Sequence, residues 1–237
     1  MIDFHSHILP SLDDGSSSVA ESIEMLRLSS RDGVRGIVAT PHFYAHREAP
    51  EHFLKRRRTS WEQLAPQLPD DVPEIYLGAE VYYYTGISNT EGLSRLCIGG
   101  GDTLLLEVPF HKWSERMVDE VIDLAQDTGL TVLLAHIDRY LASQSAETWD
   151  ELADNGVLFQ MNASAFLGGW LARRRACRLL DAGRIAVLGS DCHNMEERKP
   201  NLGEACEVIR KKCGARRVYA LTGKAEQLLA SGQSAKK

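Results

Sequence analysis

The chain has 237 residues, 43% of them hydrophobic, and carries a formal net charge of −6. This length fits one large domain better than two small ones, so we expect a single domain over residues 1–230 and a frayed polar tail over 231–237. The acidic balance argues against nucleic acid as a partner, because phosphate-backbone binding draws on a basic surface. No apolar run approaches the roughly 18 residues of a membrane span, so none is predicted.

The five cysteines are odd in number, scattered and without a CxxC pair. This usage predicts reduced thiols and a cytoplasmic protein rather than disulfides. Basic clusters at 55–58, 173–175 and 211–217 fall in helix-like stretches. Such clusters usually form a solvated face, and a docking surface for an acidic partner is the less common alternative.

Short apolar runs alternate with amphipathic stretches along the whole chain. Strands are expected near 2–5, 34–40, 74–80, 102–108, 130–136, 157–162 and 184–190. Helical periodicity between them is clear over 18–31 and over 114–127, and loops are expected at 66–73 and 99–101. Seven strands separated by helices predict a parallel α/β fold.

The sequence His5-Ser6-His7 directly follows the first apolar run. On a strand, residues i and i+2 point to the same face, so both imidazoles can converge on one metal ion. Asp191-Cys192-His193 repeats this spacing after the seventh predicted strand. Cys192 should then point the other way, into the core.

Further metal-type side chains stand where other predicted strands end: His42, Glu80, Glu107 and His136. The sixth predicted strand ends at Asn162. In an α/β barrel the carboxyl ends of all strands open on one face, where active sites are built. Each residue alone is more often a packing residue than a ligand. Together they predict a metal centre, because carboxylates clustered without cations would repel one another.

Imidazole and carboxylate ligands suit Mn, Fe, Zn or Co, and ligand type alone does not choose among these metals. Asp14 lies in a loop after the first strand, where it either forms a turn or completes a further metal site. Arg139 and Arg198 follow His136 and His193 closely, so both are candidates for the same rim. The planar guanidinium suits a phosphate, although a lone Arg is more often in a surface ion pair.

Six motifs together resemble a known family: HSHILPSLDDG at 5–15, TPH at 40–42, GAEVYY at 78–83, LLEVP at 105–109, AHIDRY at 135–140 and SDCHN at 190–194. They are similar to the PHP (polymerase and histidinol phosphatase) superfamily and, within it, to the CpsB/YwqE type of bacterial protein-tyrosine phosphatase. This resemblance implies a distorted (β/α)7 barrel of the PHP type. It also implies three divalent metal ions, commonly Mn²⁺.

The resemblance further implies a role for each site residue. One metal would be held by His5, His7, Glu80 and Asp191, a second by Glu80, Glu107 and His136, and a third by Asp14, His42 and His193. Arg139 and Arg198 match the family's phosphate-binding arginines. The implied partner is a phosphotyrosyl protein, a bacterial tyrosine kinase with a Tyr-rich tail, in capsule or exopolysaccharide production. The resemblance does not decide whether the protein forms a homo-oligomer.

These features predict metal-dependent hydrolysis of a phosphate monoester. Phe43, Tyr44 and 82–84 form either a rim for the phenyl ring of phosphotyrosine or barrel-edge packing. Two alternatives are a small-molecule phosphatase of the histidinol-phosphate type and a noncatalytic module that docks on a kinase. Cys192 and Arg198 also have the Cys-x5-Arg spacing of cysteine-dependent phosphatases. We interpret this as coincidence, because the intervening residues include no Gly and two carboxylates.

Overall fold

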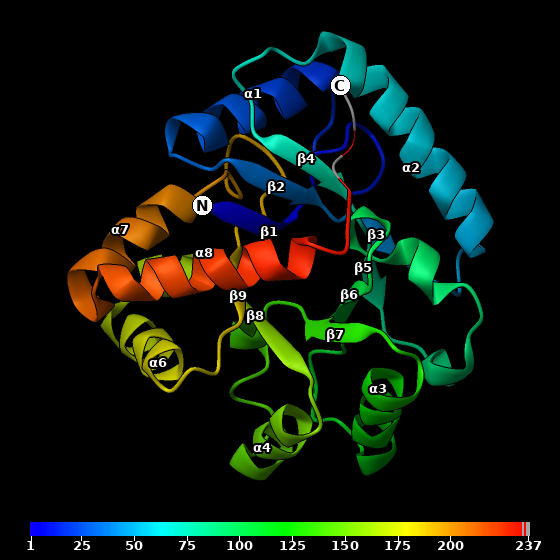
Figure 1. Ribbon diagram of the computed structural model, residues 1–237, viewed down its shortest axis with the longest axis vertical. Coiled ribbons are helices and arrows are strands. Elements are labelled where there is room, and N and C mark those ends of the chain that lie inside the picture. Colours follow the sequence, from blue (N-terminus) through cyan, green and yellow to red (C-terminus); the bar gives the residue numbers. More distant parts are fainter. Residues whose placement is uncertain (234, 236–237) are drawn as a thin grey trace.

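The computed structural model describes residues 1–233 and Ala235. In this part of the chain nine strands alternate with helices (Figure 1). The strands are β1 Ile2–Ser6, β2 Gly36–Ala39, β3 His42–Phe43, β4 Glu74–Leu77, β5 Glu80–Tyr82, β6 Thr103–Glu107, β7 Thr131–Leu134, β8 Leu158–Asn162 and β9 Val187–Gly189. All of their pairings are parallel.

Eight α-helices and five short 3-10 helices connect the strands. The α-helices are α1 Val19–Arg31, α2 Pro50–Leu64, α3 Glu115–Asp127, α4 Ala146–Asp154, α5 Ser164–Leu167, α6 Trp170–Asp181, α7 Leu202–Cys213 and α8 Ala215–Leu229. The 3-10 helices are Ala65–Gln67, Ile87–Asn89, Leu93–Leu96, Ile98–Gly100 and Ile137–Arg139. All of these counts refer to the described residues. None of the described helices has the length and apolar character needed to cross a membrane.

The two helices predicted from periodicity are present and begin where their sequence indicates. The hydroxyl of Ser18 accepts a hydrogen bond from the backbone N–H of Glu21 and caps α1. Ser114 accepts one from the N–H of Met117 and caps α3. These bonds satisfy N–H groups that have no partner inside the first turn of the helix.

The strands form a distorted barrel of seven parallel segments. The predicted second and third strands are each divided, so that β1, β2 and β4 form one sheet and β3, β5, β6, β7, β8 and β9 the other. The division follows Pro41, which has no N–H to continue the ladder. The backbone bond from Gly78 N to Ala39 O (2.8 Å) and that from Glu80 N to Pro41 O (3.0 Å) still join the two segments across it.

The barrel closes between the first and last strands. The N–H of Asp191 donates to the carbonyl of His5, and the N–H of His7 donates to the carbonyl of Cys192, both within 2.9 Å. The β1 strand and the chain after β9 are therefore neighbours, although they are nearly 190 residues apart in sequence. The two candidate metal-ligand pairs lie side by side as a result. The predicted distorted (β/α)7 barrel is confirmed.

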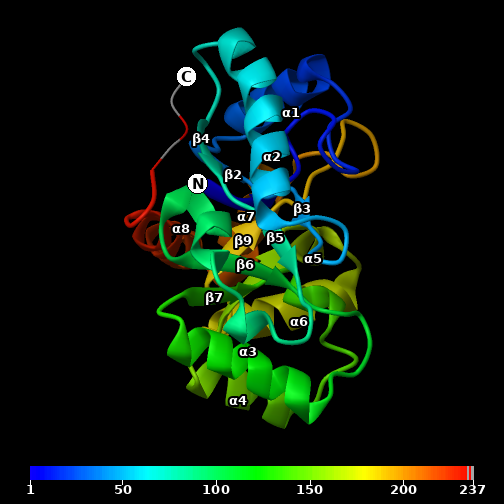
Figure 2. The same ribbon diagram turned by 90° about the vertical axis from the view of Figure 1, so that its right-hand side faces the viewer.

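Helices cover the barrel on several sides. Figures 1 and 2 show α1 and α2 at one end of the molecule, α3 and α4 at the other, and α8 lying across the strands. Apolar residues of α8 pack in one buried cluster with residues from the strands and from the segments next to them: Phe4, Val38, Ile98, Leu105, Leu133, Ala135, Val187, Ala225, Leu228 and Leu229. This cluster leaves the carboxyl ends of the strands free for polar side chains.

The predicted tail 231–237 falls partly outside the described residues. Within the described part, the Ser231 hydroxyl donates to a carboxylate oxygen of Asp102, and the N–H of Gln233 donates to the carbonyl of Gly99, each at 2.8 Å. Gly99 has φ +61°, and a Cβ there would lie 2.8 Å from the nitrogen of Gln233. The segment 99–102 therefore packs closely against residues 231–233.

Candidate metal centre

All nine predicted metal ligands lie at the carboxyl ends of the barrel strands. Their positions are His5 in β1, His7 and Asp14 after it, His42 in β3, Glu80 in β5, Glu107 at the end of β6, His136 after β7, and Asp191 and His193 after β9. Seven are buried, His42 is partly buried, and only Asp14 is mostly exposed. Short distances between donor atoms join these side chains into three overlapping groups.

The first group is formed by His5, His7, Glu80 and Asp191. The Nε2 atoms of the two histidines are 3.1 Å apart, and both lie 3.3 Å from Oε2 of Glu80. Oδ1 of Asp191 is 3.7 Å from His5 Nε2 and 3.6 Å from His7 Nε2. Four donor atoms from three barrel segments thus surround one point.

The second group surrounds the other side of Glu80. Its Oε1 lies 2.8 Å from Nε2 of His136, which is 3.5 Å from Oε1 of Glu107. His42 also faces this group, with Nδ1 2.9 Å from Glu80 Oε2 and 3.7 Å from Glu107 Oε2. Glu80 therefore lies between two groups, in the arrangement of a carboxylate that bridges two ions.

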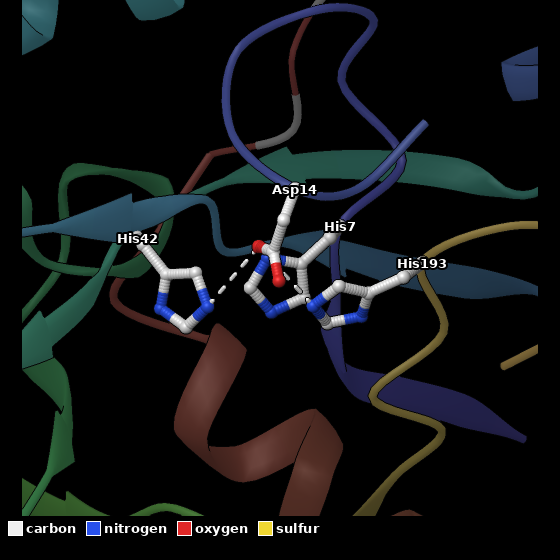
Figure 3. Close-up of side chains that lie close together, drawn as sticks. All are labelled: His7, Asp14, His42 and His193. Atoms are coloured by element: carbon white, nitrogen blue, oxygen red, sulfur yellow. Dashed lines mark ion pairs between the residues drawn. The ribbon is translucent and has the colours of Figure 1, made fainter. Parts of the chain in front are cut away.

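The third group contains His7, Asp14, His42 and His193, whose side chains point toward one another in Figure 3. Oδ1 of Asp14 lies 3.4 Å from Nε2 of His42 and 3.5 Å from Nε2 of His193. The family resemblance assigned His7 only to the first group and His42 only to this one. In the structure each of these histidines borders two groups, because the three groups share a common centre.

The unsatisfied atoms of the cluster fit divalent cations. His42 Nδ1, Glu80 Oε2 and His193 Nε2 are buried and lack a hydrogen-bond partner among the described residues. His42 Nδ1 and Glu80 Oε2 are close enough for an ion pair, but their orientation does not make a hydrogen bond. Leaving such atoms unpaired costs about 1–3 kcal/mol each. Cations that accept imidazole and carboxylate ligands would satisfy them.

Burial and mutual contacts shift the pKa values of the cluster in opposite directions. Burial alone lowers the pKa of His136, but Glu107 and Glu80 outweigh it and raise that pKa to about 9. Burial alone raises the pKa of Glu80, but His5 and His136 hold it well below its usual range. Without cations His136 therefore carries a proton between the two carboxylates. We infer that cations and protons compete for this cluster, so metal binding weakens as the pH falls.

Backbone strain is concentrated at the centre. Ser11, His136 and Asp191 are the non-glycine residues with positive φ in the part of the chain that the structure describes, at 55°, 31° and 53°. This conformation is costly for residues with a Cβ and persists where surrounding contacts enforce it. Two of the three, His136 and Asp191, are candidate metal ligands, and each is the second residue after the end of its strand.

Three side chains with low exposure, whose role was not predicted from the sequence, hold the ligands in place. Asp13 Oδ2 accepts a hydrogen bond from Nδ1 of His7 (2.8 Å). Gln160 Oε1 lies 3.2 Å from Nδ1 of His5 and accepts from the N–H of His136. Asn162 donates to Oδ2 of Asp191 at 2.9 Å. Such partners fix ring orientation and typically change metal affinity 10–100-fold. The i, i+2 pair of amides on β8 was the available sequence signal.

Arg139 and Arg198, the two predicted phosphate-binding residues, both contact Asp191. Their terminal nitrogens are 2.5 Å and 2.8 Å from the two carboxylate oxygens of Asp191. Both side chains are about one third exposed, at 35% and 37%, so each guanidinium reaches from a buried ligand toward solvent. The two fork-shaped donors converge beside the metal groups, where an incoming phosphate would meet both.

Cys192 is buried in an apolar cluster with residues of α1 and β2. Burial raises the pKa of its thiol above the ordinary range, so it is protonated at neutral pH and a poor nucleophile. We expect Cys192→Ser to leave kcat within about threefold of the native value, in circular-dichroism-verified folded protein. A loss of phosphatase activity comparable to that of a metal-ligand variant would instead support the Cys-x5-Arg mechanism.

Asp3 is a buried carboxyl below the centre. Burial raises its pKa from 3.8 to about 6, and its Oδ2 has no hydrogen-bond partner among the described residues. Ionising Asp3 in the folded protein therefore lowers the free energy of unfolding. This loss is absent below pH 4, grows up to about pH 6 and is fully present above that pH. A shift of two units corresponds to about 2–3 kcal/mol.

We therefore expect Asp3→Asn to stabilise the chelator-treated protein by about 2–3 kcal/mol at pH 8 and by much less at pH 4. Asparagine keeps the oxygen that accepts from the N–H groups of His5 and Ser190. Urea unfolding of both chains at the two pH values gives the difference. Equal stability differences at both pH values would contradict the raised pKa.

Aromatic side chains flank two of the histidines. Tyr44 stacks on His42 with ring centroids 5.4 Å apart, and Phe110 stacks on His136 at 5.9 Å. Phe43 and Tyr83, which were candidates for a substrate rim, are instead buried in the core. Phe110 was not singled out in the sequence, because a single aromatic residue after a strand carries no specific pattern.

Comparison with known proteins agrees with this geometry. The family model for capsular polysaccharide synthesis proteins, CpsB/CapC, matches residues 1–230. The chain is 32% identical to the tyrosine-protein phosphatase CpsB of Streptococcus pneumoniae, over 93% of this chain and 94% of that one. It is 31% identical to the tyrosine-protein phosphatase YwqE of Bacillus subtilis, over 97% and 91%.

A solved structure has the same fold over its full length. It comes from the crystal structures of YwqE from B. subtilis and CpsB from S. pneumoniae, described as unique metal-dependent tyrosine phosphatases. The TM-score is 0.84, with 28% identity and complete coverage of both chains. The match of the family model to nearly the whole chain, together with the curated relatives, shows that this protein belongs to the CpsB/CapC family.

Proposed function

We propose that the protein is a metal-dependent protein-tyrosine phosphatase. The observation that carries this proposal is the pair of arginines, Arg139 and Arg198, bonded to Asp191 at the edge of three His/carboxylate groups. The names of the relatives, tyrosine-protein phosphatases, support the same activity. The cofactor would be three divalent cations, with Mn²⁺ as our first choice.

The proposed ligand sets are those that the family resemblance implies, and the short distances between their donor atoms support them. His5, His7, Glu80 and Asp191 would hold one cation, and Glu80, Glu107 and His136 a second. Asp14, His42 and His193 would hold a third, with His7 at its border. Bound cations in such a site lower the pKa of water and neutralise charge on phosphoryl oxygens.

The protein's own residues would bind and orient the phosphate. Each guanidinium can donate two parallel hydrogen bonds to phosphoryl oxygens. Asp191 holds both guanidinium groups toward the same side of the cluster, so they would act on one phosphoryl group. Phenolate leaves more readily than an alkoxide, so a tyrosyl ester needs less help from a proton donor.

The proposed partner is a phosphotyrosyl segment of a bacterial tyrosine kinase in capsule or exopolysaccharide synthesis. The description of the family as capsular polysaccharide synthesis proteins supports this context. The five free thiols support a reducing compartment and thus the predicted cytoplasmic location.

Metal analysis combined with turnover of three substrates tests the proposal. We expect the metal-loaded protein to hydrolyse a phosphotyrosyl peptide faster than histidinol phosphate or single-stranded DNA, and to lose this activity on chelation. Preference for histidinol phosphate would favour a small-molecule phosphatase. Full activity after complete metal removal would contradict the metal mechanism, and no turnover of any substrate would favour a noncatalytic module.

A further inference from the structure

Phe110 is an exposed aromatic side chain at the edge of the candidate metal centre. It lies in the loop after β6, three residues beyond Glu107, and 53% of it is exposed. The other large hydrophobic residues with such exposure are Trp170, Leu171 and Tyr219, on α6 and α8. An exposed aromatic ring loses the favourable free energy of burying its apolar surface. Its exposed position beside a polar site therefore suggests that it binds a ligand.

The ring of Phe110 rests on a rigid support. Its centroid is 5.4 Å from that of the buried Tyr140, with 22° between the planes, and 5.9 Å from that of His136. Trp113 packs on Tyr140 and donates a hydrogen bond to the carbonyl of Pro109, which fixes the chain next to Phe110. The position of the ring is therefore set by packing below it, while its outer side is open.

Phe110 also borders the proposed phosphate-binding group. The Cζ atom of Arg139 lies 5.8 Å from the ring centroid. Arg139 in turn contacts Asp191 of the first metal group. A phosphoryl group held by Arg139 would thus have an aromatic surface directly at its side, and only one ester oxygen separates phosphorus from the ring of an aryl phosphate.

We propose that Phe110 forms a subsite for the aryl ring of the substrate and gives the site its preference for aryl over alkyl phosphates. This inference rests on the proposed phosphatase function. Aromatic pairs in offset or edge-to-face arrangements gain about 0.5–1.5 kcal/mol beyond the area they bury. An alkyl ester would not make this contact, so Phe110 discriminates between the two classes.

Tyr44, the aromatic residue on the other side of the centre, is less suited to this role. One side of its ring is stacked on His42, and the guanidinium carbon of Arg47 lies 4.5 Å from its centroid. Tyr82 packs against it as well, at 5.6 Å. Phe110 also contacts neighbouring groups, but 53% of it is exposed, whereas Tyr44 is partly buried and is not among the exposed large hydrophobic residues.

Direct binding of two phosphonates to the metal-loaded protein, measured by isothermal titration calorimetry, tests the subsite. Phenylphosphonate and methylphosphonate share the phosphonate group and differ in the ring. We expect Phe110→Ala to raise the dissociation constant of phenylphosphonate about five- to tenfold and to leave that of methylphosphonate within twofold. Phe110→Leu, which keeps the apolar contact, should fall between. Tyr219→Ala, on the exposed surface of α8, is the matched control and should change neither constant.

Two results would overturn the subsite. Equal weakening of both phosphonates in Phe110→Ala would mean that the ring only supports Arg139 or His136. Unchanged binding of both would mean that the aryl group lies elsewhere. The phosphatase function is judged separately, because native protein that binds phenylphosphonate through Phe110 but does not hydrolyse a phosphotyrosyl peptide would refute the function and leave the subsite standing.

Discussion

Asp191→Asn is expected to lower kcat for a phosphotyrosyl peptide by at least about 10³-fold, equivalent to about 4 kcal/mol. The side chain lies within 3.7 Å of both His5 and His7, and it contacts Arg139 and Arg198. Asparagine has nearly the same shape but lacks the charge that a cation and two guanidinium groups require. We expect lower metal content by elemental analysis together with the lower kcat.

Two further variants show whether the loss reflects the metal. His136→Ala, in the second group, should reduce activity and metal content in the same way, because its Nε2 faces Glu80 and Glu107. Cys192→Ser, adjacent to Asp191, controls for damage to this segment of chain. Native kcat in a folded Asp191→Asn protein with a full metal complement would exclude Asp191 as a ligand.

The position of the candidate site could be predicted because the carboxyl ends of the strands can be located in the sequence. A polar metal-type residue directly after an apolar run, as at His136 and Asp191, needs only the parallel topology to reach the common rim. The i, i+2 spacing of His5 and His7 then fixed the face on which the cluster forms. These are local patterns whose geometry is set by one strand.

Features that depend on packing between distant segments could not be predicted in this way. Asp13 has the sequence of a turn residue, and its bond to His7 depends on how the loop folds back over β1. Phe110 becomes informative only when Tyr140 and His136 lie beneath it. The division of the second and third barrel segments around Pro41 likewise depends on how these segments pair in the closed barrel.

Arg139→Lys and Arg198→Lys are each expected to lower kcat/KM for a phosphotyrosyl peptide about 10²-fold, or about 2.7 kcal/mol. Lysine keeps the positive charge but cannot donate two parallel bonds to one phosphoryl group. Because both arginines contact Asp191 and would act on the same phosphate, the double variant should lose less than the product of the two single losses. Steady-state kinetics of the three variants gives the coupling.

Metal content shows whether the lower kcat/KM of the Lys variants comes from weaker phosphate binding or from loss of a metal ion. Both Lys variants should retain their full complement, whereas Asp191→Asn should not. Arg184→Lys is a matched control: this arginine is 36% exposed, close to the value of Arg139, and pairs with Asp150 rather than with any residue of the metal groups. We expect it to keep native kcat/KM. If Arg139→Lys and Arg198→Lys both kept the kcat/KM of the native protein, the guanidinium groups would serve only to hold Asp191. Phosphate would then be bound by other groups of the centre.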